Sequence, residues 1–321
     1  DKAQNDLESL AKNKGRVTGL TTGLVDLDNL TNGFSPTQMI IVAARPAVGK
    51  TAFALNIACA AAKSTKKNIA VFSLEMPAEQ LIMRMISSLG QVDNKKLQTG
   101  KLENEDWRRV NEAISQLADT NIYFHDAGGV TASEIKAKCR RLASMKDGLD
   151  IVIIDYLQLL SSGENLKNRV EEVSKISRGL KEMARTFEIP VLALSQLSRG
   201  VEDRENKTPQ LADLRESGSI EQDADIVFFI YRRKDVEDQD VADQLNEKLK
   251  EEQLQRESKS KKEMLEVIIS IAKNRQGPLQ DFDYHFYGHL CRFTEQKEFR
   301  KPVLKKRKSS GMRRLNGNNN N

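Results

Sequence analysis

Short apolar runs alternate along the chain with longer stretches whose apolar residues recur at helical spacing. Several runs consist almost entirely of Val, Ile, Leu and Phe, which is typical of strands covered on both faces. The alternation predicts βαβ units around a parallel sheet, and so an α/β fold. The expected strands cover residues 38–43, 68–73, 122–124, 151–154, 190–194, 226–230 and 266–271, and the expected helices cover 50–63, 78–89, 103–117, 132–145 and 170–187.

Three segments fall outside this alternation. Residues 1–16 are polar and helix-compatible, and we interpret them as a linker or docking segment. Residues 234–263 carry ten acidic and seven basic residues, with apolar residues at near-helical spacing. This pattern predicts a solvated, partly amphipathic helical insertion, and the alternative is a helix that docks a partner. Residues 300–321 are basic and end in an Asn-rich run, which predicts a disordered tail. One folded domain is therefore expected over residues 17–299.

The net charge of the 321-residue chain is +5, but it is unevenly distributed. Residues 300–321 hold eight basic residues and no acidic one, whereas residues 1–299 hold 43 basic and 46 acidic residues. The expected domain is therefore mildly acidic. Its overall charge does not indicate a surface for nucleic acid. The tail is expected either to add sequence-independent, salt-sensitive contact with DNA or to dock a partner.

Membrane, secreted and metal-bound classes are disfavoured. The longest apolar runs are far below the roughly 20 residues that span a bilayer, and the polar start lacks the apolar region of a signal peptide. The three cysteines, Cys59, Cys139 and Cys291, form no CxxC pair and have no metal-ligand spacing with the three histidines. We expect packing thiols in a reducing cytoplasm, no structural zinc and no membrane contact.

The strongest chemical signal lies at residues 40–51, where an apolar strand passes through a tight loop into an Ala-rich helix. Such a loop turns its backbone N–H groups and the helix dipole toward a phosphate. Lys50 is expected to reach the β- and γ-phosphates of ATP, and the Thr51 hydroxyl to bind Mg²⁺. The usual pattern has Gly where this chain has Ala44, so a chance Gly-Lys-Thr at a helix start is the alternative. The expected nucleotide-binding residues are Ala44, Arg45, Pro46, Ala47, Val48, Gly49, Lys50, Thr51 and Ala52.

Polar residues follow three further expected strands. Asp155 comes directly after residues 151–154, Glu75 follows 68–73, and Gln196 follows 190–194. Because ligands bind at the carboxyl ends of parallel strands, we expect these side chains to face the loop. A carboxylate there supports Mg²⁺ or orients the attacking water, and an amide senses the γ-phosphate. The alternative is that Asp155 caps a turn or a helix.

Six segments together resemble the C-terminal motor domain of the replicative hexameric helicases, the DnaB-like branch of the RecA-type ATPases. Residues 44–51 resemble that branch's phosphate loop, in which Gly is replaced, and the resemblance spans about residues 15–294. The remaining segments are 73–76, 154–159, 194–199, 213–225 and 273–278. The resemblance implies a RecA-like P-loop NTPase fold, with a mostly parallel sheet and helices on both faces.

The same resemblance implies specific roles. Lys50 and Thr51 would bind ATP and Mg²⁺ with support from Asp155, Glu75 would act as general base, and Gln196 would sense the γ-phosphate. Two further groups are implied: Arg275 with Lys273 as trans-acting cations in a neighbour's site, and Arg215, Glu216 and Gly218 as a loop on single-stranded DNA. Arg275 as a surface turn residue, and a local pair of Arg215 with Glu216, remain the alternatives.

The implied function is ATP-driven translocation on single-stranded DNA and unwinding at the replication fork. The implied assembly is a homo-hexameric ring, with primase and a helicase loader as partners. Two other functions remain open. One is a recombinase or clock-type ATPase of the same fold, and the other is a DNA-binding or loading ring that does not unwind.

Overall fold

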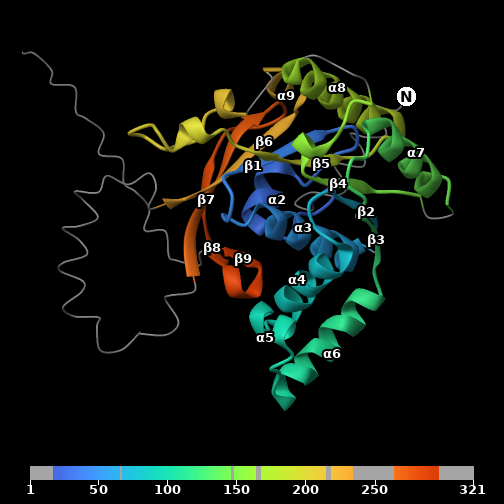
Figure 1. The fold of residues 1–321 in the computed structure, drawn as a ribbon, viewed down its shortest axis with the longest axis vertical. Coiled ribbons are helices and arrows are strands. Elements are labelled where there is room, and N and C mark those ends of the chain that lie inside the picture. Colours follow the sequence, from blue (N-terminus) through green and yellow to red (C-terminus); the bar gives the residue numbers. More distant parts are fainter. Residues whose placement is uncertain are drawn as a thin grey trace, which may run out of the picture.

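A nine-stranded sheet with the strand order β3-β2-β4-β5-β1-β6-β7-β8-β9 organises the protein in the computed structural model (Figure 1). The structure describes residues 17–65, 67–145, 148–163, 168–214, 218–233 and 264–295. The first six strands of that order are parallel, and the last three continue the sheet antiparallel. The strands are β1 (Met39–Ala44), β2 (Asn68–Ser73), β3 (Asn121–His125), β4 (Ile151–Asp155), β5 (Val191–Gln196), β6 (Ile226–Arg232), β7 (Met264–Asn274), β8 (Asp281–Tyr287) and β9 (Arg292–Glu295).

Helices cover both faces of the sheet, as Figure 1 shows. The core on one face contains buried side chains of α3 and α4, together with side chains of strands β8 and β9, and the core on the other face contains side chains of α7, α8 and α9. Strands β1, β2 and β4 are buried along their whole length, because helices lie against both of their faces. The helices are α2 (Val25–Thr31), α3 (Lys50–Thr65), α4 (Ala78–Gly90), α5 (Asn94–Thr99), α6 (Asn104–Ala118), α7 (Ala132–Ala143), α8 (Arg169–Phe187) and α9 (Gly218–Asp223).

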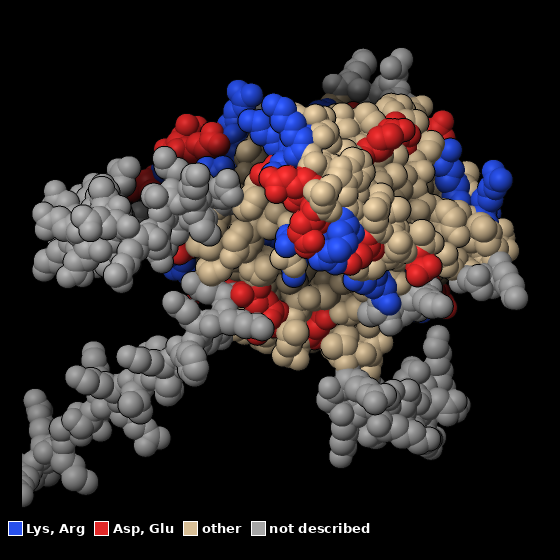
Figure 2. Space-filling view, turned by 90° about the horizontal axis from the view of Figure 1, so that it is seen from below, with Lys and Arg blue, Asp and Glu red and all other residues tan. Residues whose placement is uncertain are grey.

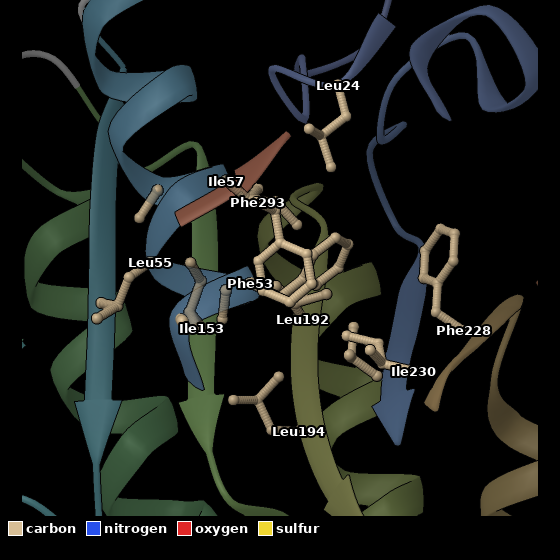
Figure 3. Close-up of a cluster of buried hydrophobic side chains, with 14 of the residues drawn as sticks. Leu24, Phe53, Leu55, Ile57, Ile153, Leu192, Leu194, Phe228, Ile230 and Phe293 are labelled. Atoms are coloured by element: carbon tan, nitrogen blue, oxygen red, sulfur yellow. The ribbon is translucent and has the colours of Figure 1, made fainter. Parts of the chain in front are cut away.

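The core on the α3 face is rich in aromatic residues. Phe53 of α3 packs edge-on against Phe228 of β6 and Phe293 of β9, with ring centroids 6.4 and 5.5 Å apart. Figure 3 shows this cluster, with Leu192 and Leu194 of β5 beside it. The antiparallel strands β8 and β9 therefore fold back onto α3, and this return brings them next to the start of that helix.

The expected α/β fold is confirmed. Each expected strand and helix is present with ends shifted by at most a few residues, but the periodicity analysis did not include β8, β9 or the short helices α2, α5 and α9. Strand β8 alternates buried and half-buried residues, a period-two signal that its sequence carries. Residues 1–16, residues 296–321 and the expected insertion at 234–263 lie outside the described residues.

No helix of the described ranges combines the length and apolar character that crossing a bilayer requires. Charge on the face seen in Figure 2 is mixed, with acidic and basic side chains interspersed. This face presents no broad basic field, in agreement with the mildly acidic composition of the domain.

Candidate nucleotide-binding site

A tight loop joins β1 to α3 at the carboxyl edge of the sheet. Ala47 and Gly49 have positive φ values of 63° and 103°, a backbone region that side chains disfavour. A Cβ atom on Gly49 would lie 2.9 Å from the rings of both Phe286 and Phe293. Glycine is required here for two reasons, the strained backbone angle and the aromatic wall behind the loop.

Asp155 ends β4 beside the first turn of α3. The Thr51 hydroxyl donates a hydrogen bond of 2.6 Å to its Oδ2, and the Lys50 ammonium lies 3.9 Å from its Oδ1. The backbone N–H of Leu74 donates to the Asp155 carbonyl at 2.8 Å, which ties the ends of β2 and β4 together. Two segments about a hundred residues apart in sequence thus meet as one constellation of hydroxyl, ammonium and carboxylate.

The Lys50 ammonium is largely buried and lies near two carboxylates and an aromatic ring. Burial lowers the pKa of Lys50, and the nearby carboxylates of Asp155 and Glu75 oppose that shift. The ammonium also lies 4.3 Å from the centroid of the Tyr156 ring, within cation–π range. Burial, together with Glu75 and Asp155, raises the pKa of Tyr156. A phosphate group would add negative charge beside a lysine whose charge is only partly balanced.

The Asp155 carboxylate fits a divalent cation. Asp155 is 2% exposed, and within the described residues its Oδ1 atom is buried without a hydrogen-bond partner. Leaving a buried carboxylate oxygen unpaired is costly, and a cation offsets that cost. Magnesium prefers oxygen ligands and is usually held by one or two carboxylates together with substrate phosphates. Thr51 and Asp155 are therefore suited to hold Mg²⁺ between them.

The expected catalytic and sensing residues line the same cleft. Glu75 and Gln196 both face a hollow of about 460 Å³ in front of the loop. The end of β5 is held by Gln158, whose Oε1 accepts from the Gln196 N–H at 3.2 Å and whose Nε2 donates to the Ser195 hydroxyl at 2.8 Å. The structure thus brings Lys50, Thr51, Glu75 and Gln196 to one cleft, with Asp155 bonded to Thr51 at its floor.

Most of the loop residues line the cleft, and some of them also anchor the loop to the rest of the protein. Eight of the nine expected residues line the cleft, whereas Val48 is buried in the core. Arg45 lies at the rim, where its Nε donates to Glu202 at 2.8 Å and its Nη1 donates to the Leu197 carbonyl at 2.9 Å. Arg45 therefore anchors the loop to the segment that follows β5.

The periodicity and motif analysis missed part of the cleft wall. Met76 directly follows Glu75 and Tyr156 directly follows Asp155, so these sequence neighbours were the available signal. The other missed residues come from α4, α5 and the region of β8 and β9, and only the tertiary fold brings them to the phosphate loop. These residues are Met76, Arg84, Asn94, Tyr156, Phe286, Gly288 and Cys291.

Arg275 and Lys273 lie at the opposite edge of the sheet. Asn274, between them in sequence, pairs with Ile226 at the start of β6, whereas the phosphate loop follows the end of the neighbouring strand β1. The Arg275 guanidinium is 3.5 Å from an Asp225 carboxylate oxygen, and the Lys273 ammonium donates to the Glu221 carbonyl at 2.5 Å. Burial and the nearby Arg275 lower the pKa of Lys273. Neither cation reaches the cleft of its own chain.

The expected DNA loop is only partly described. Arg215 and Glu216 lie outside the described residues, and Gly218 opens α9, which packs on α8. A Cβ atom on Gly218 would meet no atom within 4 Å in the described part of the chain. Crowding by the described residues therefore gives no reason for glycine at that position.

Comparisons with known proteins agree with this geometry. The model of the DnaB-like helicase C-terminal domain matches residues 19–295. The replicative DNA helicase DnaC of Bacillus subtilis is 48% identical over 291 residues, which cover 90% of this chain and 59% of that protein. The replicative DNA helicase DnaB of Geobacillus stearothermophilus shows the same identity and coverage. The chain therefore spans less than two thirds of the length of these relatives.

Solved structures give the same result. A DnaB-like replicative helicase, studied with its interactions with primase, superposes with a TM-score of 0.78 at 36% identity, covering 92% of this chain and 66% of that one. A solved ATPase domain superposes with a TM-score of 0.79 at 34% identity, covering 92% of this chain and 98% of that domain. The sheet and its helices thus match a known ATPase domain over nearly its full length.

Proposed function

This chain belongs to the DnaB-like helicases, as their C-terminal domain, and on that basis we propose that it is an ATP-driven motor that translocates on single-stranded DNA and unwinds duplex DNA at the replication fork. The observation that carries the proposal is the contact of Thr51 and Lys50 with Asp155, in a cleft that Glu75 and Gln196 also line. Hydrolysis of a nucleoside triphosphate needs these elements together.

The residues of the cleft divide the work of hydrolysis. The loop N–H groups and Lys50 hold the phosphates of ATP, while Thr51 and Asp155 hold Mg²⁺. Bound Mg²⁺ would neutralise charge on the β- and γ-phosphates. Glu75, exposed at the mouth of the cleft, accepts a proton from the attacking water and orients it. Gln196 contacts the γ-phosphate. Loss of that phosphate changes the position of Gln196 and so of the segment that follows β5.

Arg275 and Lys273 complete the site of a neighbouring copy in a homo-hexameric ring. Their place at the edge opposite their own cleft supports this assignment, because a closed ring built head to tail apposes opposite edges of adjacent subunits. An arginine supplied in trans stabilises the charge that develops during phosphoryl transfer. Hydrolysis at one interface is thereby coupled to the arrangement of two subunits.

Arg215, Glu216 and Gly218 form the loop that holds DNA in the channel of the ring. Arginine and backbone N–H groups bind phosphates without reading the sequence, which suits a motor that must move along any strand. Primase and a helicase loader are the proposed protein partners, and the structural neighbour studied with primase supports the first of these.

ATPase and unwinding assays test the proposal together. Lys50→Ala should lower ATP hydrolysis by at least a hundred-fold, because the cation that contacts the β- and γ-phosphates is lost. On forked DNA, the unaltered protein should separate the strands with ATP, and Lys50→Ala should not. Normal ATPase activity in Lys50→Ala would overturn the site assignment. A ring that binds DNA and hydrolyses ATP but never unwinds would favour the non-unwinding loading protein instead.

A further inference from the structure

We propose that Ser73 is a positioning residue for hydrolysis, whose hydroxyl fixes the turn that presents Glu75 to the attacking water. The inference rests on the proposed function, because it takes Glu75 as the general base. Ser73 is the last residue of β2 and is 1% exposed. It does not belong to the described residues that line the cleft, so its hydroxyl acts through its neighbours and not by touching the nucleotide.

The position of the Glu75 carboxylate depends on the backbone that carries it. Glu75 is exposed and lines the cleft, and its carboxylate makes no hydrogen bond or ion pair with any of the described residues. A general base must lie within hydrogen-bond reach of the proton that it accepts. Because no side chain in the described part of the chain holds this carboxylate, its direction is set by the turn at residues 74–77, which joins β2 to α4.

The Ser73 hydroxyl closes this turn with two hydrogen bonds to a single residue. It donates to the Met76 carbonyl at 2.6 Å and accepts from the Met76 N–H at 3.3 Å. Both bonds span Leu74 and Glu75, so they fix the two ends of the segment from which the Glu75 side chain projects. Serine hydroxyls commonly hold turns in this way, by binding backbone groups a few residues away.

The turn is also tied to the strand that carries the proposed metal-supporting carboxylate. Ser73 lies opposite Asp155 in the pairing of β2 with β4, and the Leu74 N–H donates to the Asp155 carbonyl at 2.8 Å. At the other end of the turn, the Ala78 N–H of α4 donates to the Asp126 carboxylate at 3.0 Å. Both ends are therefore held, and the Ser73 hydroxyl supplies the bonds between them. The general base is thereby fixed relative to the proposed Mg²⁺ site.

Removing the hydroxyl should slow hydrolysis without weakening nucleotide binding. In Ser73→Ala the Met76 N–H and carbonyl lose their shared partner, so the turn can shift. A displacement of about 1 Å at a catalytic group costs up to about a hundred-fold in rate, and kcat of the ATPase should fall about ten-fold to a hundred-fold. The Kd for ADP and for the non-hydrolysable analogue AMP-PNP should stay within about three-fold, because Lys50 and its loop are unaltered. Steady-state assays and titration calorimetry give these quantities.

A double-mutant cycle with Glu75→Gln separates positioning from general damage to the site. Glu75→Gln has already lost the carboxylate that Ser73 positions. Adding Ser73→Ala to it should therefore change the single-turnover rate of hydrolysis by less than about two-fold. A merely structural role predicts the same ten-fold to hundred-fold loss in both backgrounds, and that result would contradict the inference.

Thr22 provides a matched control for the loss of a buried hydroxyl. Its hydroxyl also closes a short turn, since it donates to the Leu24 carbonyl and accepts from the Leu24 N–H, each at 3.2 Å. This turn lies away from the cleft. A Cβ atom on Gly23 would be 2.3 Å from that of Ala60, which is about 15 Å along α3 from Lys50. Thr22→Ala should lower the midpoint of thermal unfolding, as Ser73→Ala does, but leave kcat unchanged.

The outcomes distinguish this inference from the proposed function. Ser73→Cys has a side chain of similar size with only a weak donor, so it should lose less activity than Ser73→Ala. It carries the test if circular dichroism shows that Ser73→Ala does not fold. Unchanged kcat in the folded variant would overturn the inference alone. If Glu75→Gln kept the kcat of the unaltered protein, Glu75 would not be the general base, and the proposed role of Glu75 would fail together with the inference.

Discussion

Asp155 contributes both to the sheet, through its backbone, and to the nucleotide-binding cleft, through its carboxylate. Its carbonyl accepts a hydrogen bond from the Leu74 N–H, and its Oδ2 accepts one from Thr51. Its Oδ1 has no hydrogen-bond partner among the described residues and lies 3.9 Å from the Lys50 ammonium. Four buried apolar residues precede it in β4, so the strand fixes the carboxylate at the floor of the cleft. Burying this carboxylate costs free energy, and a bound cation offsets that cost.

Replacing this carboxylate by an amide separates the role of Asp155 in the fold from its role in supporting Mg²⁺. Asp155→Asn keeps the size of the side chain and its acceptor oxygen, so the fold should be preserved. The variant loses the charge that supports Mg²⁺, and kcat should fall by about a hundred-fold or more while the Mg²⁺ concentration for half-maximal ATPase activity rises. Steady-state ATPase assays across a Mg²⁺ titration give both quantities.

Asp150 provides the matched control at the other end of β4. It accepts from the Lys67 ammonium at 2.8 Å and from the Asn68 N–H at 2.9 Å, far from the phosphate loop. Asp150→Asn should leave the Mg²⁺ dependence of the ATPase unchanged. An Asp155→Asn variant with the Mg²⁺ response of the unaltered protein would contradict the assignment of Asp155 as a metal-supporting residue.

Among the elements, the start of β6 is tied to its neighbours by one buried carboxylate. Asp225 accepts from the Met39 N–H of β1 at 2.7 Å and from the Lys181 ammonium of α8 at 2.5 Å, and its carbonyl accepts from the Arg275 N–H at 2.9 Å. Asp225 is 8% exposed. The motif at 213–225 therefore ends in a structural residue that joins β1, α8 and the end of β7.

Removing that carboxylate should destabilise the fold. Asp225→Ala leaves the half-buried Lys181 ammonium and the Met39 N–H without their partner, and the free energy of unfolding should fall by about 3 kcal/mol, the cost of breaking a buried pair. Urea denaturation followed by circular dichroism measures the change. Asp119→Ala, at an exposed position after α6, should change the same free energy by less than about 0.5 kcal/mol. Equal effects of the two substitutions would show that Asp225 is not a tie between elements.

Within the whole molecule, the two halves of the proposed active site lie at opposite edges of the sheet. The cleft with Lys50 and Glu75 is at the carboxyl edge, and Arg275 is at the amino edge. One chain therefore carries both halves but cannot join them. The proposed ring requires each site to form between two copies.

Mixing two inactive variants tests this division of labour. Arg275→Ala and Glu75→Ala should each lower kcat of the ATPase by about a thousand-fold, by loss of the finger and of the base. In mixed rings, some interfaces combine the intact cleft of one variant with the intact arginine of the other, so activity should recover to a fraction set by the mixing ratio. Mixing Lys50→Ala with Glu75→Ala should give no recovery, since both defects lie on the same side of the interface. Absence of recovery with Arg275→Ala at every ratio would contradict the trans role.

The sequence by itself determined the strands and helices and the motif residues that contiguous positions encode. Buried strands of Val and Ile, the Gly-Lys-Thr turn and the acid after β4 are encoded by contiguous residues, so periodicity and motif spacing predicted the elements and the positions of Lys50, Thr51, Glu75, Asp155 and Gln196. Their convergence followed from one general rule, that the carboxyl ends of parallel strands share an edge.

Only the tertiary structure decided what surrounds those residues. The wall formed by Arg84, Asn94, Phe286 and Gly288 depends on how α4 packs on α3 and on how β8 and β9 fold back against it. These are contacts between elements far apart in the chain, set by the shapes of buried side chains rather than by any local pattern. The placement of Arg275 at the opposite edge is decided in the same way, because the antiparallel pairing of β7 with β6 carries the end of β7 to the start of the parallel strands.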